Sequence, residues 1–215
     1  MDRPQFSGAP VQAQPERKRK TDRRSLIRTT ALSLFAERGY DRTSLKDIAD
    51  RIGITHPALY YYYKSKSDIL FDAIRTALVQ TGADLSACID DETLNAEQKL
   101  HRLIETQITV QLDLQEANRL IDSVLFGTMS RSEIFNYEQT KELLELQRQL
   151  VQPYRTVLAD GVEAGCFDVT DETVVTFAIL GAVSNLPYWY NPDGELSVPD
   201  VTARLVSLFL KSIKP

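Results

Sequence analysis

The segment GITHPALYYYYKSK, residues 53–66, contains four consecutive tyrosines, and its flanks are typical of a short helix. Gly53 is suited to ending a preceding helix, Thr55 can cap the next one, and Pro57 is tolerated in a first helical turn because its missing N–H has no partner there. Successive helical residues step by about 100° around the axis, so four tyrosines in a row cannot all face one core. Some of these rings must therefore contact something other than the core of their own domain.

Helical spacing divides the tyrosines into an inner and an outer set. Tyr63 lies four residues after Leu59, and we expect both side chains to pack inward against Ile48 and Ile52. Tyr62 falls on the flank. The outward side carries His56, Pro57, Tyr60 and Tyr61.

The outward side chains have the chemistry that a DNA groove accepts. Hydroxyl groups, and the ammonium groups of Lys64 and Lys66 close by, can donate to phosphate oxygens, and flat ring surface suits a thymine methyl group. Loose packing against a following helix accounts for one outward ring but not for three. The segment therefore favours contact with double-stranded DNA.

Amphipathic patterns on either side of this segment predict three more helices. Residues 22–38 repeat apolar side chains at helical spacing and stop at Gly39, while Thr43 or Ser44 can cap a second short helix. We expect Ser67 to cap a fourth helix. Two short helices joined by a glycine turn have the dimensions of a helix-turn-helix, although any small helical bundle can contain such a pair.

The charge distribution distinguishes a helix-turn-helix from an ordinary small helical bundle. The chain has a formal net charge of −5, yet residues 16–66 carry 13 Lys and Arg against 6 Asp and Glu, whereas residues 67–215 carry 11 against 23. Such asymmetry can serve solubility alone, but a basic segment beside an acidic domain more often marks a surface that binds a polyanion. The charge favours the helix-turn-helix.

Composition sets the limits of the remaining interpretation. With 215 residues, 43% of them apolar and 26% charged, the chain has the composition of a globular protein with one large domain or two smaller ones. Cys88 and Cys166 have no spacing typical of a disulfide framework or a zinc site, so we expect a reducing cytoplasm and no metal or cofactor. Residues 1–20 lack an apolar core segment, which argues against a secretory signal and predicts a flexible basic arm.

The second part of the chain has the pattern of an all-α domain. We expect helices over residues 96–115, 117–129 and 131–163, the last with a kink or a short break at Pro153, and a closing helix over 197–213. We also expect Gly161 and Gly165 to end the long helix. Pro153 and the junction at residues 81 and 82 are candidate pivots, and the alternative for each is a passive break.

Residues 173–190, TVVTFAILGAVSNLPYWY, contain no charged side chain. The segment is too polar and too short for a membrane span, so we expect a helix that is buried on every side in a protein without a membrane anchor. Small residues within it would let another helix approach closely. A homodimer that pairs this helix and the last one with their two-fold mates fits best, and a central position in a monomer is the alternative.

Enzyme motifs are absent from the sequence. It contains no GxSxG, HExxH, GxGxxG or phosphate-loop motif, and His56 and His101 are its two histidines. The competing hypothesis is a helical enzyme or carrier that binds acyl chains without binding DNA. A third is an activator or architectural DNA-binding protein whose second domain holds no ligand.

Within residues 24–70, the motifs ALSLFAERGYDRTS, IADRIGIT and ALYYYYKSKSDIL resemble the TetR family of bacterial transcriptional regulators. The resemblance implies an all-α fold with a three-helix DNA-binding domain at residues 21–80, the head, and a helical effector-binding and dimerisation domain at residues 81–215, the body. Pro57 and Tyr62 depart from the family's usual residues, so no operator preference is implied. The residues that we expect to bind DNA are Thr43, Ser44, Thr55, His56, Pro57, Ala58, Tyr60, Tyr61, Tyr62, Lys64 and Lys66.

The tail NLPYWYNPDGELS, residues 185–197, is similar to that of TetR members that respond to acyl-CoA thioesters. This similarity implies an acyl-CoA thioester as a candidate effector. For the whole chain, the leading hypothesis is a repressor that a small apolar effector releases from a palindromic operator. Candidate effector-binding residues are Arg102, Arg119, Arg148, Arg155 and Trp189.

Overall fold

The computed structural model describes residues 14–113, 119–121, 123–124 and 131–215, and these residues form helices and connecting turns without a strand. The predicted all-α fold is therefore confirmed. The helices are α1 (Gln14–Arg38), α2 (Leu45–Ile52), α3 (His56–Tyr62), α4 (Lys66–Ile89), α5 (Ala96–Asp113), α7 (Arg131–Ile134), α8 (Tyr137–Glu163), α9 (Glu172–Ser184), α10 (Leu186–Trp189) and α11 (Val198–Ser212).

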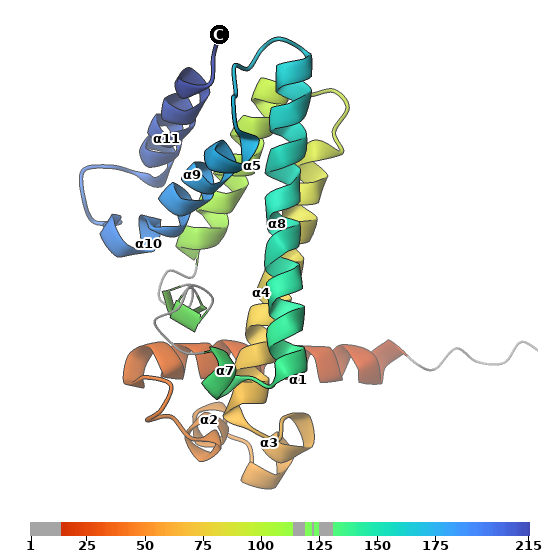
Figure 1. Ribbon diagram of the computed structural model, residues 1–215. Coiled ribbons are helices and arrows are strands. Elements are labelled where there is room, and N and C mark those ends of the chain that lie inside the picture. The colour runs from red at the N-terminus through yellow and green to blue at the C-terminus, as the bar shows by residue number, and fades with distance from the viewer. Residues whose placement is uncertain (1–13, 114–118, 122, 125–130) are drawn as a thin grey trace, which may run out of the picture.

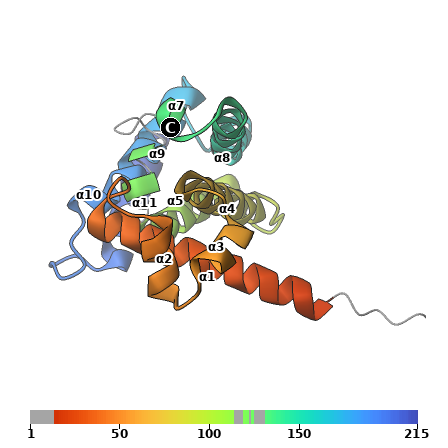
Figure 2. The ribbon, with the colours of Figure 1, turned by 90° about the horizontal axis from the view of Figure 1, so that it is seen from below.

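Helices α4 and α8 lie side by side and give the molecule its long axis (Figure 1). Helix α4 joins the head to the body, and α8 belongs to the body. At one end, α1 crosses them, and α2 and α3 lie beyond it. At the other end, α5 and α9 to α11 complete the body. Seen from below in Figure 2, α2 and α3 face the viewer and are not covered by the body.

The helix-turn-helix forms where the sequence predicts it. The Ser44 hydroxyl accepts a hydrogen bond from the Asp47 N–H and so caps α2, and Gly53 adopts φ 74°, a left-handed conformation that favours glycine. Thr55 caps α3 through the N–H of Ala58. Leu59 is fully buried, which confirms that the inner side of α3 packs into the head.

The first helix begins earlier than expected. The flexible arm was expected to span residues 1–20, but α1 starts at Gln14, so the expectation is wrong for residues 14–20. Arg and Lys have high helix propensity, and a helix that tertiary contacts already stabilise further along can extend through such residues. Residues 1–13 lie outside the described residues.

The start of α4 also differs from the expectation. Ser65, not Ser67, caps this helix, because its hydroxyl is three residues from the N–H of Asp68 and accepts a 3.0 Å hydrogen bond from it. The helix then continues without interruption through Thr81 and Gly82. No break marks the candidate pivot at that junction.

The long helix expected over residues 131–163 is divided near its start. Asn136 and Gln139 form a capping box that starts α8, and α7 is a separate short helix. The helix is continuous through Pro153, so no break occurs there. The helix expected over residues 117–129 lies mostly outside the described residues, and of it 119–121 and 123–124 are helical.

Two hydrophobic clusters share α4. The cluster of the head includes α4 residues as far as Leu78 and also takes in Phe135 and Leu143 from the body. The cluster of the body begins on α4 at Leu85 and includes the fully buried Tyr154 of α8, whose hydroxyl donates to the Leu103 carbonyl. A single continuous helix therefore contributes to both cores.

Gly161 lies inside α8 and does not end it. A Cβ at this position would lie 2.0 Å from Cδ2 of the Phe167 ring, so the glycine allows the chain after the helix to fold back onto it. Gly165, with φ 70°, follows the end of the helix. The lack of a side chain at residue 161 thus makes room for the Phe167 ring against α8.

Gly161→Ala is expected to lower the free energy of unfolding by about 1–3 kcal/mol, because the added methyl group overpacks the contact with Phe167. Chemical denaturation measures the effect. Gly82→Ala is the control, because its Cβ would meet Leu150 at an ordinary 3.4 Å, and we expect it to stabilise the helix by up to about 1 kcal/mol. Equal effects of the two substitutions would contradict this explanation.

Candidate nucleic-acid interface and effector cavity

The outer side of α3 presents aromatic and polar side chains to solvent. Tyr61 is 69% exposed and Tyr60 is 40% exposed, whereas Tyr63 is 3% exposed. The division of the tyrosines into outer and inner sets is therefore confirmed. Exposed with them are Thr55, His56, Pro57, Ala58 and Lys64.

Contacts between neighbouring rings restrict their motion on this surface. His56 meets Tyr60 edge to face with centroids 4.8 Å apart, and Tyr61 meets Tyr62 in the same way at 5.2 Å. Lys64 donates to the carbonyl of Tyr60 across 3.2 Å. Tyr62 is half-buried against the head core. Rings restricted in this way lose less entropy when they bind a partner.

Three other predicted DNA-contacting residues have structural roles. Thr43 is 2% exposed, and its hydroxyl donates to the carbonyls of Leu34 and Gly39, so this hydroxyl is not presented to a DNA phosphate in the structure. Ser44 is exposed but caps α2. Lys66 donates to the carbonyl of Tyr40 at 2.8 Å, which leaves its ammonium group partly occupied.

A cavity of about 660 Å³ lies in the body between α4, α5, α8 and α9. Its lining is mostly apolar, and Arg148 is the one charged side chain among the described residues that line it. Polar groups come from each of the four helices and from the residues next to them. The apolar part of the lining includes Ala77, Leu78, Val110, Ile121, Leu144, Leu150, Val151, Phe177 and Leu180, and the polar part includes Thr81, Gln107, Gln111, Ser123, Gln147, Ser184, Asn185 and Tyr188.

The structure brings one of the five predicted effector residues, Arg148, to this cavity. Arg102 forms a 3.0 Å ion pair with Asp91 instead. Arg119 donates to the carbonyl of Pro187 at 2.6 Å, next to the cavity residue Tyr188.

The remaining two candidates, Arg155 and Trp189, also lie away from the cavity lining. Arg155 is 3.4 Å from the hydroxyl of Thr173, and its Nε is buried without a hydrogen-bond partner among the described residues. Trp189 is half exposed at the end of α10. Neither side chain lines the cavity in which an effector is expected.

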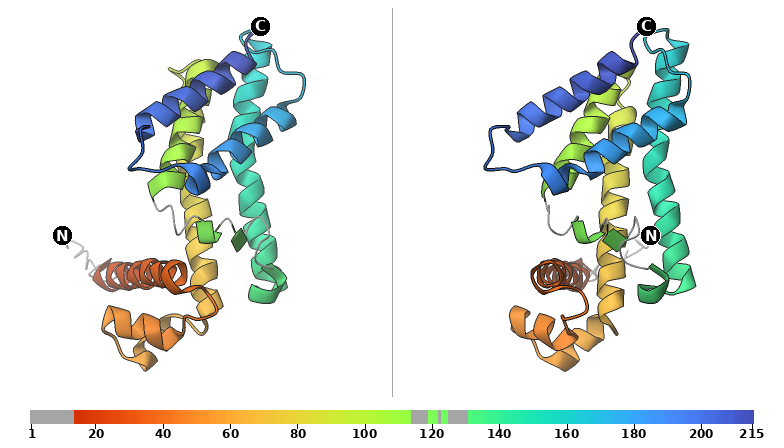
Figure 3. Two further views of the ribbon diagram at one scale, coloured as in Figure 1. Left: turned by 90° about the vertical axis from the view of Figure 1, so that its left-hand side faces the viewer. Right: turned by 60° about the vertical axis from the view of Figure 1, so that its left-hand side comes forward.

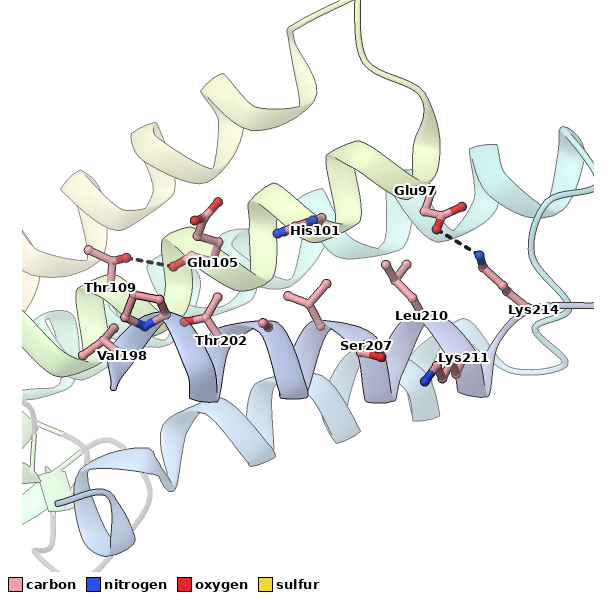
Figure 4. A pocket seen from close by; sticks show the side chains of 13 residues that line it. Glu97, His101, Glu105, Thr109, Val198, Thr202, Ser207, Leu210, Lys211 and Lys214 are labelled. Atoms are coloured by element: carbon pink, nitrogen blue, oxygen red, sulfur yellow. Dashed lines mark hydrogen bonds and ion pairs between the residues drawn. The ribbon is translucent and has the colours of Figure 1, made fainter. Parts of the chain in front are cut away.

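A second hollow of about 680 Å³ runs between α5 and α11 (Figure 4). Its walls carry both charge signs, and the 3.0 Å ion pair between Glu97 and Lys214 closes one end. His101 of α5 is one of the residues that line it. This groove has apolar side chains as well, but it carries four charged ones, Glu97, Glu105, Lys211 and Lys214, and does not touch α4, so the first cavity is the better candidate for an apolar effector.

Large apolar side chains remain exposed on the last helices. Figure 3 shows α9, α10 and α11, drawn in blue, together at the end of the body away from α2 and α3. The uncharged segment is thus not buried on every side in a single chain, because one side of α9 faces solvent. The exposed apolar side chains are Val174, Phe177, Tyr188, Trp189, Val198 and Leu208.

The described parts of the chain contain a candidate neither for a membrane crossing nor for a metal site. None of the helices there combines the length and apolarity that a membrane crossing requires. The same residues contain no group of three or more His, Cys, Asp and Glu that could bind a metal ion.

Two family models match the chain. The model described as "Tetracyclin repressor-like, C-terminal domain" matches residues 93–213, and the model described as "Bacterial regulatory proteins, tetR family" matches residues 27–73. The chain belongs to the TetR family. TetR proteins are transcriptional regulators, so the hypothesis of an enzyme or carrier without DNA binding is wrong.

Relatives of this TetR protein align over most of its length. The transcriptional repressor KstR2 of Rhodococcus jostii is 26% identical over 195 residues, which cover 90% of this chain and 92% of KstR2. A regulator of the TetR/AcrR family from Thermobifida fusca is 34% identical, with a TM-score of 0.70 over 88% of this chain and 97% of that one. AibR, solved with isovaleryl coenzyme A and operator DNA, is 22% identical, with a TM-score of 0.74 over 86% of this chain and 97% of AibR.

Sequence reasoning missed most of the residues that line the cavity of this TetR protein. It selected arginines by their charge, whereas the lining consists of apolar side chains and uncharged polar groups such as Gln107 and Thr81. A usable signal existed on α5. Glutamines at 107 and 111 interrupt an otherwise apolar helical face, and both are buried.

Proposed function

We propose that this TetR protein is a cytoplasmic homodimeric repressor that leaves a near-palindromic operator when a small apolar effector fills the cavity of the body. The head, residues 21–80, would bind DNA, and the body, residues 81–215, would bind the effector and the second subunit. The observation that carries the proposal is the exposed aromatic and polar side of α3, at the end of a basic segment.

Operator contact follows from the chemistry of that surface. Thr55 and His56 stand at the first turn of α3, the part of a recognition helix that meets base edges, and Tyr60 and Tyr61 add phenol hydroxyls. Lys64 is exposed and adds a cation that could contact the phosphates of the DNA backbone. In a two-fold dimer, two such helices about 34–36 Å apart would enter successive major grooves.

The effector class follows from the lining of the cavity. Apolar walls favour an apolar body, and the absence of a carboxylate from the described lining, with Arg148 present, favours an anionic group over a cationic one. An acyl-CoA thioester combines these features, since its acyl chain is apolar and its phosphates are anionic. AibR, a protein of the same fold, has been solved with isovaleryl coenzyme A.

Coupling between effector and operator would pass along α4. Ala77, Leu78 and Thr81 of this helix line the cavity, and its first turns carry Ile69 and Leu70 of the head core. An effector that binds better to a conformation with a different spacing of the two heads would lower operator affinity by that difference in affinity.

Dimerisation would cover the exposed side of α9 and α11. Val174, Phe177 and Leu208 are each more than half exposed in the single chain, and apolar surface of this kind is typical of subunit interfaces. The exposed Ala178 and Gly181 would let the helix of a second copy approach closely.

The proposal is tested by selecting duplexes from a random library with the purified protein and measuring binding by fluorescence anisotropy. We expect a near-palindromic site and a loss of affinity of about 10³-fold between 50 and 200 mM salt, because phosphate contacts release counterions. Acyl-CoAs of increasing chain length should release the duplex, whereas free CoA, the matched control, should not. No selected sequence, or salt-independent binding, would contradict the proposal.

A further inference from the structure

One carboxylate of the head, that of Asp72 on α4, joins three segments of the DNA-binding domain. The guanidinium of Arg28 on α1 lies 3.1 Å from its Oδ2, and that of Arg24 lies 3.5 Å from the same oxygen. The hydroxyl of Tyr63, directly after α3, also donates to Oδ2. We call Arg24, Arg28, Tyr63 and Asp72 the Asp72 cluster. Figure 2 shows α1, α3 and α4 meeting in this region.

The cluster also holds the backbone at the end of α3. Arg24 donates to the carbonyl of Tyr62 at 3.2 Å, and its guanidinium carbon lies 4.8 Å from the centroid of the Tyr63 ring. Tyr62 is the last residue of α3. A cation on α1 is therefore fixed to the recognition helix by one hydrogen bond and one ring contact.

Burial limits the solvent screening of these contacts. The side chains of Arg28 and Asp72 are 18% and 21% exposed. Burial, and then the hydrogen bond to Asp72, raise the pKa of the Tyr63 phenol, so it remains a hydrogen-bond donor at neutral pH. Two guanidinium groups beside one oxygen would repel each other without the carboxylate between them.

The recognition helix has few other means of fixing its orientation. It has seven residues and one buried side chain, that of Leu59. Its start is held by the Thr55 cap and the turn at Gly53. Its end is held by the Tyr63 ring and by the contacts of the Asp72 cluster, so the loss of the cluster would release one end of the helix.

We propose that Asp72 is a positioning residue for operator recognition, which fixes the end of α3 and withholds the guanidinium groups of Arg24 and Arg28 from DNA phosphates. This inference rests on the proposed DNA binding. Base readout depends on the placement of α3, whereas phosphate contact depends mainly on charge. The cluster would therefore raise discrimination between sequences rather than overall affinity for DNA.

The test compares Asp72→Asn with the wild-type protein on two duplexes, the one that the wild type selects from a random library and a scrambled version of it. We expect the ratio of the two affinities to fall by about tenfold or more, because affinity for the selected duplex drops while affinity for the scrambled one stays the same or rises. A merely structural role would lower the amount of active protein and leave the ratio unchanged. Asp22→Asn, at an exposed position of α1, makes the same charge change and should preserve the ratio.

Tyr63→Phe is the second variant, because it removes one hydrogen bond and keeps both the charge and the ring. Tyr63→Phe should lower the ratio of affinities for the selected and scrambled duplexes without raising affinity for the scrambled one. If Asp72→Asn does not fold, the result for Tyr63→Phe alone tests the role of the Asp72 cluster. Ratios within about twofold of the Asp22→Asn value for both variants would overturn the inference while operator binding stands. A wild-type protein that does not distinguish any duplex from its scrambled version would overturn both the proposed function and this inference.

Discussion

Leu208→Glu is expected to convert the protein from a dimer into a monomer and to lower its affinity for a two-half-site operator by about 10³-fold. Leu208 is 59% exposed in the single chain and lies on the apolar side of α11 that we assign to the second subunit. A carboxylate there would be desolvated without a partner, which opposes association. The single head of a monomer would then lose the gain in affinity that linked half-site binding provides.

Size-exclusion chromatography with light scattering measures the mass, which we expect to fall from twice the chain mass to 24.3 kDa. Val79→Glu is the matched control, since Val79 is 45% exposed on α4, away from α9 and α11. It should leave both mass and operator affinity unchanged. A Leu208→Glu protein that remains dimeric would show that α11 does not form the subunit interface.

The double substitution Tyr60→Ala and Tyr61→Ala is expected to lower operator affinity by about 10²-fold with little change in the melting temperature. Contacts that read bases or position a recognition helix contribute about 1–3 kcal/mol each, and both rings are exposed in the free protein. Fluorescence anisotropy with the selected duplex measures the loss, and thermal unfolding measures stability.

Tyr137→Ala provides the control for this loss. Tyr137 is 77% exposed at the start of α8 and is therefore a tyrosine of similar exposure outside α3. Its removal should leave operator affinity unchanged. Equal losses for the control and the double substitution would mean that α3 has no special role, and a marked fall in melting temperature would mean that the rings stabilise the head.

Local signals were sufficient to predict the helix-turn-helix. The Gly53 turn, the Thr55 cap and the spacing of Leu59 and Tyr63 each depend on a few neighbouring residues, and all were confirmed. Capping patterns also account for two helix starts, that of α2, for which the sequence left Thr43 and Ser44 open, and that of α4, for which Ser67 was predicted incorrectly. Ser44, rather than Thr43, has an acidic residue three positions later, and Ser65 has Asp68 at the same spacing.

Other features depend on contacts between distant parts of the chain. Gly161 has the local appearance of a helix end, and only the Phe167 ring against it reveals a packing role. The buried state of Thr43 depends on two carbonyls at the end of α1. The effector cavity could not be predicted because its walls come from four helices, so charge alone selected arginines such as Arg102 that pair elsewhere.

The outer side of α3 is expected to contact the operator, and photocross-linking at position 61 tests this contact most directly. A photoreactive phenylalanine analogue would replace Tyr61 in one protein and Tyr137, which is exposed to a similar extent, in another. Irradiation with the selected duplex should cross-link the DNA through position 61 and not through position 137. Cross-linking through position 137 but not through position 61 would contradict the expected contact.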